Sequence, residues 1–416
     1  MASQRDIYIG IDLNDIWTQI SYCTNSEPEP ETVSLVAGEE FYRIPTALCR
    51  LRGAKGFCLP DASGERASDE DTVYIDRLWE RSLEGEQILV DQQEYPAAEL
   101  LALYLKKLLR MVPGLADASD FSGISHVTFH LGQLDFARVR LLRELMGSLG
   151  IKRELVSVQD DRESFCHFAM NQKKELKQYD NILFLCERSH LFYLYLTRDR
   201  HTRPEQILLM KQALGELPAE PGMRDQAFAR HAEKLLKGRM VSAVYLTGGG
   251  LEGGWMKESL AVLCRGRRVF QGWNLFAKGA GYGSRILAKA GTCDYVYFSE
   301  YKLKRNIFLK VREGDRTRYH EMAEAGQSRY EISSACQVLL SGDPQIEVWF
   351  QSPASNEADI RSLQLTDLPI RPRRMTRLQI ELYSGEDNRL WIRIADLGFG
   401  SWYPSSGKVW EYSIDE

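Results

Sequence analysis

Residues 245–250, Tyr245-Leu246-Thr247-Gly248-Gly249-Gly250, follow the apolar run Val241–Val244 and precede a stretch of helical character at Trp255–Leu260. A strand, a glycine-rich turn and a helix in this order allow a backbone to approach a phosphate or a nucleoside. Glycine has no Cβ and its φ is free, while a helix N-terminus offers unpaired N–H groups to an anion. Such a turn also joins strands to helices in proteins that bind nothing there, so both interpretations stay open from this stretch alone.

A second strand-and-turn unit lies near the N-terminus. Residues Ile7–Asp15 run as a strand through Asp12 into a polar turn, and Trp17–Tyr22 returns as a second strand, which predicts a β-hairpin. An acidic side chain such as Asp12 can hold a hydrated Mg²⁺ through its waters. The alternative is an ordinary hairpin turn, because Asn14 and Asp15 both tolerate left-handed backbone and cap their own turn.

The bulk composition describes a globular protein. The chain has 416 residues, which favours two or three domains, with 44% hydrophobic and 27% charged residues. Its net charge of −5 argues against a broad nucleic-acid surface, which needs a basic excess. No apolar run is long enough for a membrane span and Met1–Asp6 has no signal-peptide core. The eight cysteines show no ligand or disulfide spacing, so we expect a cytoplasmic protein.

The periodicity changes near residue 295. Before it, apolar spacing predicts an α/β unit over residues 1–291; after it, short alternating runs separated by turns predict a β-sandwich over residues 295–416. Helices are expected at residues 73–81, 96–112, 136–149, 162–171, 225–236, 255–260 and 276–290. Strands are expected, among others, at 127–131 and 153–158, with a hairpin over 182–196 and a Pro/Gly linker at 215–222.

The order of these motifs resembles the Hsp70 family of the actin/hexokinase-like ATPase fold, and in particular an uncharacterised bacterial branch of it. Ile9–Leu13 is similar to the family's first phosphate motif, Val158–Phe168 to its first connecting helix, Val244–Gly250 to its adenosine motif and Phe276–Gly283 to its second connecting helix. The resemblance implies two lobes, at about residues 1–175 and 176–291, followed by a sandwich like the one that binds polypeptides in this family.

The resemblance also implies a site for ATP or ADP with Mg²⁺. Asp12 would face the metal through water, and Asp12, Asp160 and Arg77 are the candidates for catalytic roles. The implied nucleotide contacts are Gly10, Asp12, Asn14, Asp15, Thr247, Gly248, Gly249, Gly250, Lys278 and Gly279.

Departures from the family pattern weaken that implied activity. The turn Cys186–His190 has no glycine to wrap a phosphate, and only Arg77 stands near the position of the family's catalytic lysine. The position of the family's catalytic glutamate falls near Asp160-Asp161, where the side chains are one methylene shorter. The short stretch between Cys186 and Gly248 implies a reduced upper subdomain in the second lobe. Phosphoryl transfer depends on positioned charge and metal, so we expect hydrolysis to be absent or barely measurable.

Three functions follow from this pattern. The first is a protein-binding or scaffold module with a degenerate nucleotide site. The second is an ATP-dependent chaperone-like switch in which Asp12, Asp160 or Asp161 handles Mg²⁺ and water while Arg77 or Arg188 neutralises phosphate charge. The third is a relative of small-molecule kinases. A protein or peptide partner is expected at residues 295–416 or at the seam between the units, although the sandwich could also serve only to brace the α/β unit.

Two further features have an unremarkable first interpretation. The basic run Arg371, Arg373, Arg374 and Arg377 is expected to be a solvated loop before a strand, with an acidic partner or a membrane surface as the alternative. Trp402, Tyr403 and Trp410 are expected to be core or cross-strand aromatics, with an interaction surface as the alternative.

Overall fold

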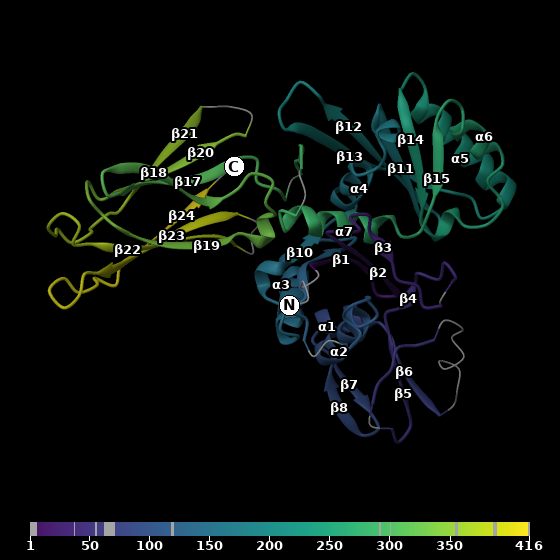
Figure 1. Cartoon of the computed structure of the whole chain (residues 1–416), viewed down its shortest axis with the longest axis horizontal. Helices are drawn as coiled ribbons and strands as arrows, with labels where there is room; N and C mark the ends of the chain where they lie inside the picture. Colours follow the sequence, from purple (N-terminus) through teal and green to yellow (C-terminus); the bar gives the residue numbers. More distant parts are fainter. Residues whose placement is uncertain are drawn as a thin grey trace. The chain divides into compact units, whose positions relative to one another are not determined.

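The protein is a mixed α/β chain with many strands and few helices (Figure 1). The computed structural model describes residues 6–36, 38–54, 56–61, 71–117, 120–290, 293–299, 301–353, 357–385 and 389–414. The chain folds into two compact units. The first comprises Met1–Arg198 and Ile207–Cys293, and the second comprises Asp199–Gln206 and Asp294–Glu416. Residues 199–206, which lie within the expected first unit of residues 1–291, therefore belong to the second unit.

The first sheet of the first unit has the strand order β10-β9-β1-β2-β3, with β4 also pairing with β2. Strands β9 and β10 run parallel to β1, whereas β2 returns antiparallel to it as the predicted hairpin. The carboxyl ends of β1, β9 and β10 therefore meet at one edge. The strands are β1 (Ile7–Leu13), β2 (Trp17–Thr24), β3 (Glu31–Thr32), β4 (Ile44–Pro45), β9 (Ile124–His130) and β10 (Val156–Gln159).

Two small sheets and one helix lie between β4 and the next large helix. They are β5 (Leu48–Leu51) with β6 (Thr72–Ile75), α1 (Leu78–Leu83), and β7 (Gln87–Val90) with β8 (Gln93–Pro96). The helix predicted at 73–81 is confirmed only for residues 78–81, and its first part is wrong. Residues 72–75 are rich in β-branched and aromatic side chains, which suit a strand, and the left-handed backbone at Arg77, with a φ of 51°, separates that strand from α1.

The second sheet of the first unit contains β15-β14-β11-β12-β13, and the predicted hairpin is present as β11 and β12. The strands are β11 (Asp180–Glu187), β12 (His190–Asp199), β13 (Glu205–Glu216), β14 (Val241–Thr247) and β15 (Arg268–Gln271). Strand β13 was not predicted. It buries only Ile207 before the turn at Leu217, so its side chains show no alternating pattern, and part of the expected linker at 215–222 is instead strand and helix.

The predicted long helices are confirmed, with ends shifted by a few residues. They are α2 (Ala97–Leu109), α3 (Phe136–Ser148), α4 (Asp161–Met170), α5 (Pro221–Leu236) and α7 (Leu275–Leu287). The strand predicted at 153–158 begins only at Val156, because Arg153–Leu155 form a 3₁₀ turn. Shorter elements are α6 (Glu258–Leu263) and 3₁₀ turns at Lys174–Lys177, Gly249–Leu251 and Arg329–Glu331.

Helix α7 packs unusually closely against β1 and α4. A Cβ on Gly10 would lie 2.1 Å from the Gly281 nitrogen, and a Cβ on Gly279 would lie 2.0 Å from the Ser164 carbonyl oxygen. Both glycines are therefore needed because backbone meets backbone there. This packing fixes the start of α7 over the carboxyl ends of β1 and β9.

The second unit contains two antiparallel four-stranded sheets around one apolar core. One has the order β18-β17-β20-β21 and the other β19-β22-β23-β24. The strands are β17 (Asn306–Glu313), β18 (Arg316–Ala323), β19 (Ser333–Leu339), β20 (Gln345–Gln351), β21 (Ala358–Gln364), β22 (Arg377–Ser384), β23 (Leu390–Gly398) and β24 (Val409–Ile414). Leu309, Phe350, Ile380 and Ile394, from both sheets, are almost fully buried in this core. A short strand, β16 (Tyr295–Tyr297), pairs with the start of β13 through the second unit's own Glu205, whose N–H donates to the Asp294 carbonyl at 3.0 Å.

Among the described residues, no helix combines the length and the apolar character that crossing a membrane requires.

The close packing of α7 predicts that replacing Gly279 destabilises the protein, and Gly147 provides a matched control. Gly279→Ala should lower the free energy of unfolding by about 2 kcal/mol or more, because the new methyl group overpacks a backbone contact. Gly147→Ala is the control, since Gly147 lies in a helix of the same length with nothing within 4 Å of its Cβ direction. It should be neutral or stabilising by up to about 1 kcal/mol. Urea unfolding of both variants tests this, and equal stabilities would contradict it.

Candidate functional site

A chain of four charged side chains lies at the carboxyl edge of the first sheet. Asp12 near the end of β1 and His130 at the end of β9 are joined by a 2.7 Å contact between Oδ1 and Nδ1. The other ring nitrogen of His130, Nε2, lies 2.9 Å from Oδ1 of Asp161, the first residue of α4. The Lys211 ammonium, from β13, bonds to the second oxygen of Asp161. We call Asp12, His130, Asp161 and Lys211 the charged chain.

The charged chain places a protonated imidazole between two buried carboxylates. Burial alone would lower the pKa of His130, but the charges and hydrogen bonds of Asp12 and Asp161 outweigh it and raise this pKa to about 10. A protonated ring can donate from both nitrogens, as the two contacts require. The ring also stacks on Phe276 of α7, with centroids 4.3 Å apart and planes 8° from parallel.

The charges in this chain balance. Burial opposes ionisation of Asp161, yet His130 and Lys211 together hold the pKa of Asp161 below its ordinary value. Two carboxylates thus face two cations supplied by the protein itself. Within the described parts of the chain, no group of three or more His, Cys, Asp or Glu side chains is arranged to hold a metal ion.

One part of this site is left unsatisfied. Gln19 lies directly across the β1–β2 ladder from Asp12 and is fully buried. Neither polar atom of the Gln19 amide, nor Oδ2 of Asp12, has a hydrogen-bond partner among the described residues. A buried polar group without a partner is costly, so these three atoms mark a place where a water or another polar guest would be stabilised.

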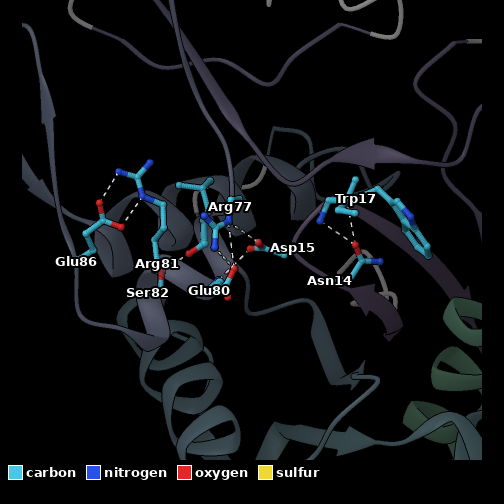
Figure 2. Close-up of polar contacts among 10 residues, drawn as sticks. Asn14, Asp15, Trp17, Arg77, Glu80, Arg81, Ser82 and Glu86 are labelled. Atoms are coloured by element: carbon cyan, nitrogen blue, oxygen red, sulfur yellow. Dashed lines mark hydrogen bonds and ion pairs between the residues drawn. The ribbon is translucent and has the colours of Figure 1, made fainter. Parts of the chain in front are cut away.

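The other two candidates for catalytic roles have structural partners. Asp160 caps α4 by accepting the Glu163 N–H at 2.9 Å, and its second oxygen lies 2.8 Å from Nε of Arg162. Arg77 lies on the surface, where Figure 2 shows it beside Glu80 and Asp15. The structure therefore brings Asp12 and Asp161 together through His130, and leaves Arg77 with a different set of carboxylates.

Asn14 and Asp15 act in the backbone of the turn that follows β1. Oδ1 of Asn14 accepts the N–H groups of Ile16 and Trp17, both at 2.9 Å (Figure 2). Oδ1 of Asp15 accepts the N–H of Glu80 at 3.0 Å and so ties the turn to α1. Asn14 thus caps its own turn, as the local-turn alternative expects, whereas Asp15 binds the first turn of α1 instead.

The space beside Gly248 and Gly250 is occupied by the end of β11 and the turn that follows it. A Cβ on Gly248, whose φ is 96°, would lie 2.4 Å from the Cys186 carbonyl oxygen. A Cβ on Gly250 would lie 2.4 Å from Sγ of Cys186, whereas Gly249 meets nothing closer than 3.8 Å. Two of the three glycines are therefore needed where the turn between β11 and β12 packs on them.

Arg224 of α5 holds this packed turn in place. Its Nη2 donates to the carbonyl oxygens of Arg188 and Gly250, both at 2.9 Å, and its guanidinium lies 5.2 Å from the ring centre of Trp255. One side chain thus joins the β11–β12 turn to the glycine-rich turn. The carbonyl oxygens of Arg188 and Gly250 therefore already accept hydrogen bonds from a cation of the same chain.

The helix expected directly after the glycines is displaced. Residues 249–251 form a 3₁₀ turn, and α6 begins only at Glu258. The carboxylate of Asp225 accepts the N–H groups of Lys257, Glu258 and Ser259 at 2.7–2.9 Å and the Ser259 hydroxyl at 2.6 Å. The prediction that this N-terminus offers unpaired N–H groups is wrong, because an internal carboxylate already holds them.

The remaining predicted contacts lie on β14 and α7. Thr247 is buried at the end of β14, opposite Leu185. Lys278 is half-buried on α7, next to Gly279, which lies against Ser164 as described above. Gly10 lies beneath the same helix.

Sequence reasoning missed His130 and Lys211. A signal for His130 was present, because it closes a predicted strand that runs parallel to β1 and ends beside Asp12. Lys211 had no such signal, since its strand was not predicted.

Comparison with known protein families identifies two matched regions. The C-terminal part of a family of unknown function (DUF5716) matches residues 29–300. A domain of unknown function (DUF8552) matches residues 302–415. The chain therefore belongs to the DUF5716 family. No curated protein matches the chain.

The charged chain predicts a specific pH dependence of stability. The pKa of His130 is raised on folding from about 6.5, so its contribution is complete below that value and is lost as the pH rises towards 10. His130→Ala should cost about 3–5 kcal/mol at neutral pH, because it leaves buried carboxylates with one cation fewer. It should also flatten the pH profile between about 6.5 and 10.

Urea unfolding at a series of pH values measures both effects. His190→Ala is the control, because His190 is exposed and pairs with the exposed Glu216 at 2.9 Å. It should keep the wild-type profile. A wild-type stability that is constant or rises across this range relative to His130→Ala would contradict a protonated His130.

Proposed function

We propose that this protein is an Hsp70-like chain with a degenerate nucleotide site that acts mainly as a protein-binding or scaffold module. In this proposal the first unit has the actin/hexokinase-like ATPase fold and the second resembles the polypeptide-binding sandwich of that family. The observation that carries it is the contact between Asp12 and His130. The carboxylate that would face Mg²⁺ is instead joined to a buried cation of the protein itself.

Three features that would serve a bound nucleotide have internal partners. Asp12 faces His130, the N-terminus of α6 holds the carboxylate of Asp225, and Gly248 lies against the Cys186 carbonyl. Phosphoryl transfer is catalysed almost entirely by positioned charge, metal and backbone N–H groups. Because those groups already have internal partners, a phosphate could bind only after these internal contacts are broken, which argues against efficient turnover.

Protein binding is supported by the edges of the second unit. Strands β18 and β21 form the two edges of one sheet, and each carries an exposed large side chain, Tyr319 and Ile360. An exposed edge offers main-chain donors and acceptors to an extended segment of another protein. The proposed partner is therefore an extended, partly apolar polypeptide.

A second candidate function has one observation in its favour. Oδ2 of Asp12 and the Gln19 amide are buried without partners among the described residues. The waters of a hydrated Mg²⁺ would donate to Oδ2 of Asp12, and a phosphate oxygen would accept from the Gln19 amide nitrogen, as an ATP-dependent chaperone-like switch would need. In that case Asp12 would use one oxygen for His130 and the other for the ligand.

Nucleotide binding separates the two candidates. A ligand that binds only the folded state must raise the melting temperature. Since we expect no binding, millimolar Mg-ATP or Mg-ADP should leave the melting temperature of the full chain unchanged. Phosphate release should equal that of an Asp12→Asn variant. A thermal shift that Asp12→Asn abolishes, together with turnover, would establish the switch in place of the scaffold.

Binding of an extended polypeptide tests the scaffold directly. A fluorescently labelled unfolded polypeptide should bind the full chain with an anisotropy change that Mg-ATP does not alter. A lysine on an edge strand opposes strand addition, so Ile360→Lys should weaken binding at least tenfold if β21 is the docking edge. Tyr319→Lys is the matched variant at the β18 edge of the same sheet. If the polypeptide fails to bind, or if neither variant weakens its binding, this edge model is wrong.

A further inference from the structure

One end of the second unit exposes three large apolar side chains. Ile370, in the loop before β22, is fully exposed, Trp402 is 89% exposed and Phe399 is 40% exposed. Phe399 and Trp402 lie in the turn after β23, where the Phe399 N–H donates to the Tyr403 carbonyl at 2.6 Å. We call Ile370, Phe399 and Trp402 the apolar tip. The expectation that Trp402 is a core or cross-strand residue is wrong.

A buried ion pair holds the apolar tip rigidly. The Asp396 carboxylate accepts hydrogen bonds from both Nη atoms of Arg371 at 2.8 Å, from the N–H of Gly398 at 2.9 Å and from the N–H of Ser406 at 2.8 Å. Nη2 of Arg371 also donates to the Pro404 carbonyl at 2.8 Å. Arg371 is therefore a buried structural residue, contrary to the solvated loop expected there, and it joins the loop of Ile370 to the turn of Trp402.

The loop at the apolar tip is basic on a chain that is acidic overall. Arg373, Arg374 and Arg377 are exposed within seven residues of Ile370, and Arg377 is the ladder partner of Gly398, next to Phe399. The nearby Asp367 is paired with Lys408 at 3.3 Å, so these two charges cancel. This end thus carries a local positive excess, whereas the full chain has a net charge of −5.

The shape of the apolar tip favours insertion into a deformable surface over binding to a preformed protein pocket. Ile370 and Trp402 expose nearly their whole side chains, so they project outward and do not line a groove. Tryptophan with a neighbouring aliphatic side chain is stabilised at the boundary between lipid headgroups and acyl chains. Arginines beside such a tip are attracted to anionic headgroups and can extend towards them.

We propose that the apolar tip and its arginines dock the protein on the surface of an anionic lipid bilayer. The tip enters the headgroup region while the rest of the unit remains outside it. The preformed loop adds to binding, because Asp396 and Arg371 have already fixed the conformation that docks. This inference rests on the second unit alone and does not depend on the proposed function.

Vesicle flotation of the full chain tests the inference. The chain should float with phosphatidylglycerol-containing vesicles, float less with added salt, and stay in solution with pure phosphatidylcholine vesicles. Ile370→Ser with Trp402→Ser should weaken vesicle binding at least tenfold. Replacing Arg373, Arg374 and Arg377 by Gln should weaken it similarly and remove its salt dependence.

The control is Leu89→Ser, which removes an exposed apolar side chain in the first unit and should bind vesicles as the wild type does. Circular dichroism should show that all variants remain folded. Equal flotation of the wild type and both tip variants would overturn the proposal, as would a complete lack of vesicle binding. So would a dimer of the full chain in sedimentation that the Ile370→Ser, Trp402→Ser variant dissociates, because the tip would then bind a second copy.

Discussion

The close approach of α7 to β1 and α4 is the constraint on which the centre of the first unit depends. Gly10 and Gly279 allow backbone to touch backbone on two sides of the helix. That contact sets the position of Phe276, which in turn covers one face of the His130 ring. A longer side chain at either glycine would move the helix and uncover the imidazole. The electrostatics of the site are thus fixed by a packing contact between backbone atoms, in which no charged side chain takes part.

The first unit repeatedly uses its own groups where a ligand-binding protein leaves groups open. A histidine neutralises Asp12, an aspartate holds the start of α6, and an arginine occupies the carbonyl oxygens around the glycine-rich turn. Each arrangement is locally favourable, since a buried charge or an exposed helix end is stabilised by an internal partner. Together they leave these charged and polar groups with internal partners, whereas the Gln19 amide and Oδ2 of Asp12 have no partner among the described residues.

Local patterns in the sequence predicted the long helices, the two hairpins and the change to short strands near residue 295, because each has a clear periodicity. They failed where the structure is set by distant partners. Strand β13 has no alternating pattern, since most of it is exposed, and Lys211 was lost with it. The cap of Asp225 on α6 joins residues more than thirty positions apart, and no local spacing reveals it. Arg371 resembles a solvated basic run in sequence, and only the fold shows its buried carboxylate partner.

The second unit is discontinuous along the chain, and this has a practical consequence for dissecting the protein. Residues 199–206, which include the last residue of β12 and the first two of β13, belong with residues 294–416. They contribute Arg203, Pro204 and Gln206 to a small hollow whose other walls are Val296, Phe298 and Pro353. A C-terminal fragment made by a single cut would lack that wall and the bond from Glu205 to Asp294. A self-sufficient version of this unit must therefore carry the 199–206 segment in a grafted or circularly permuted form.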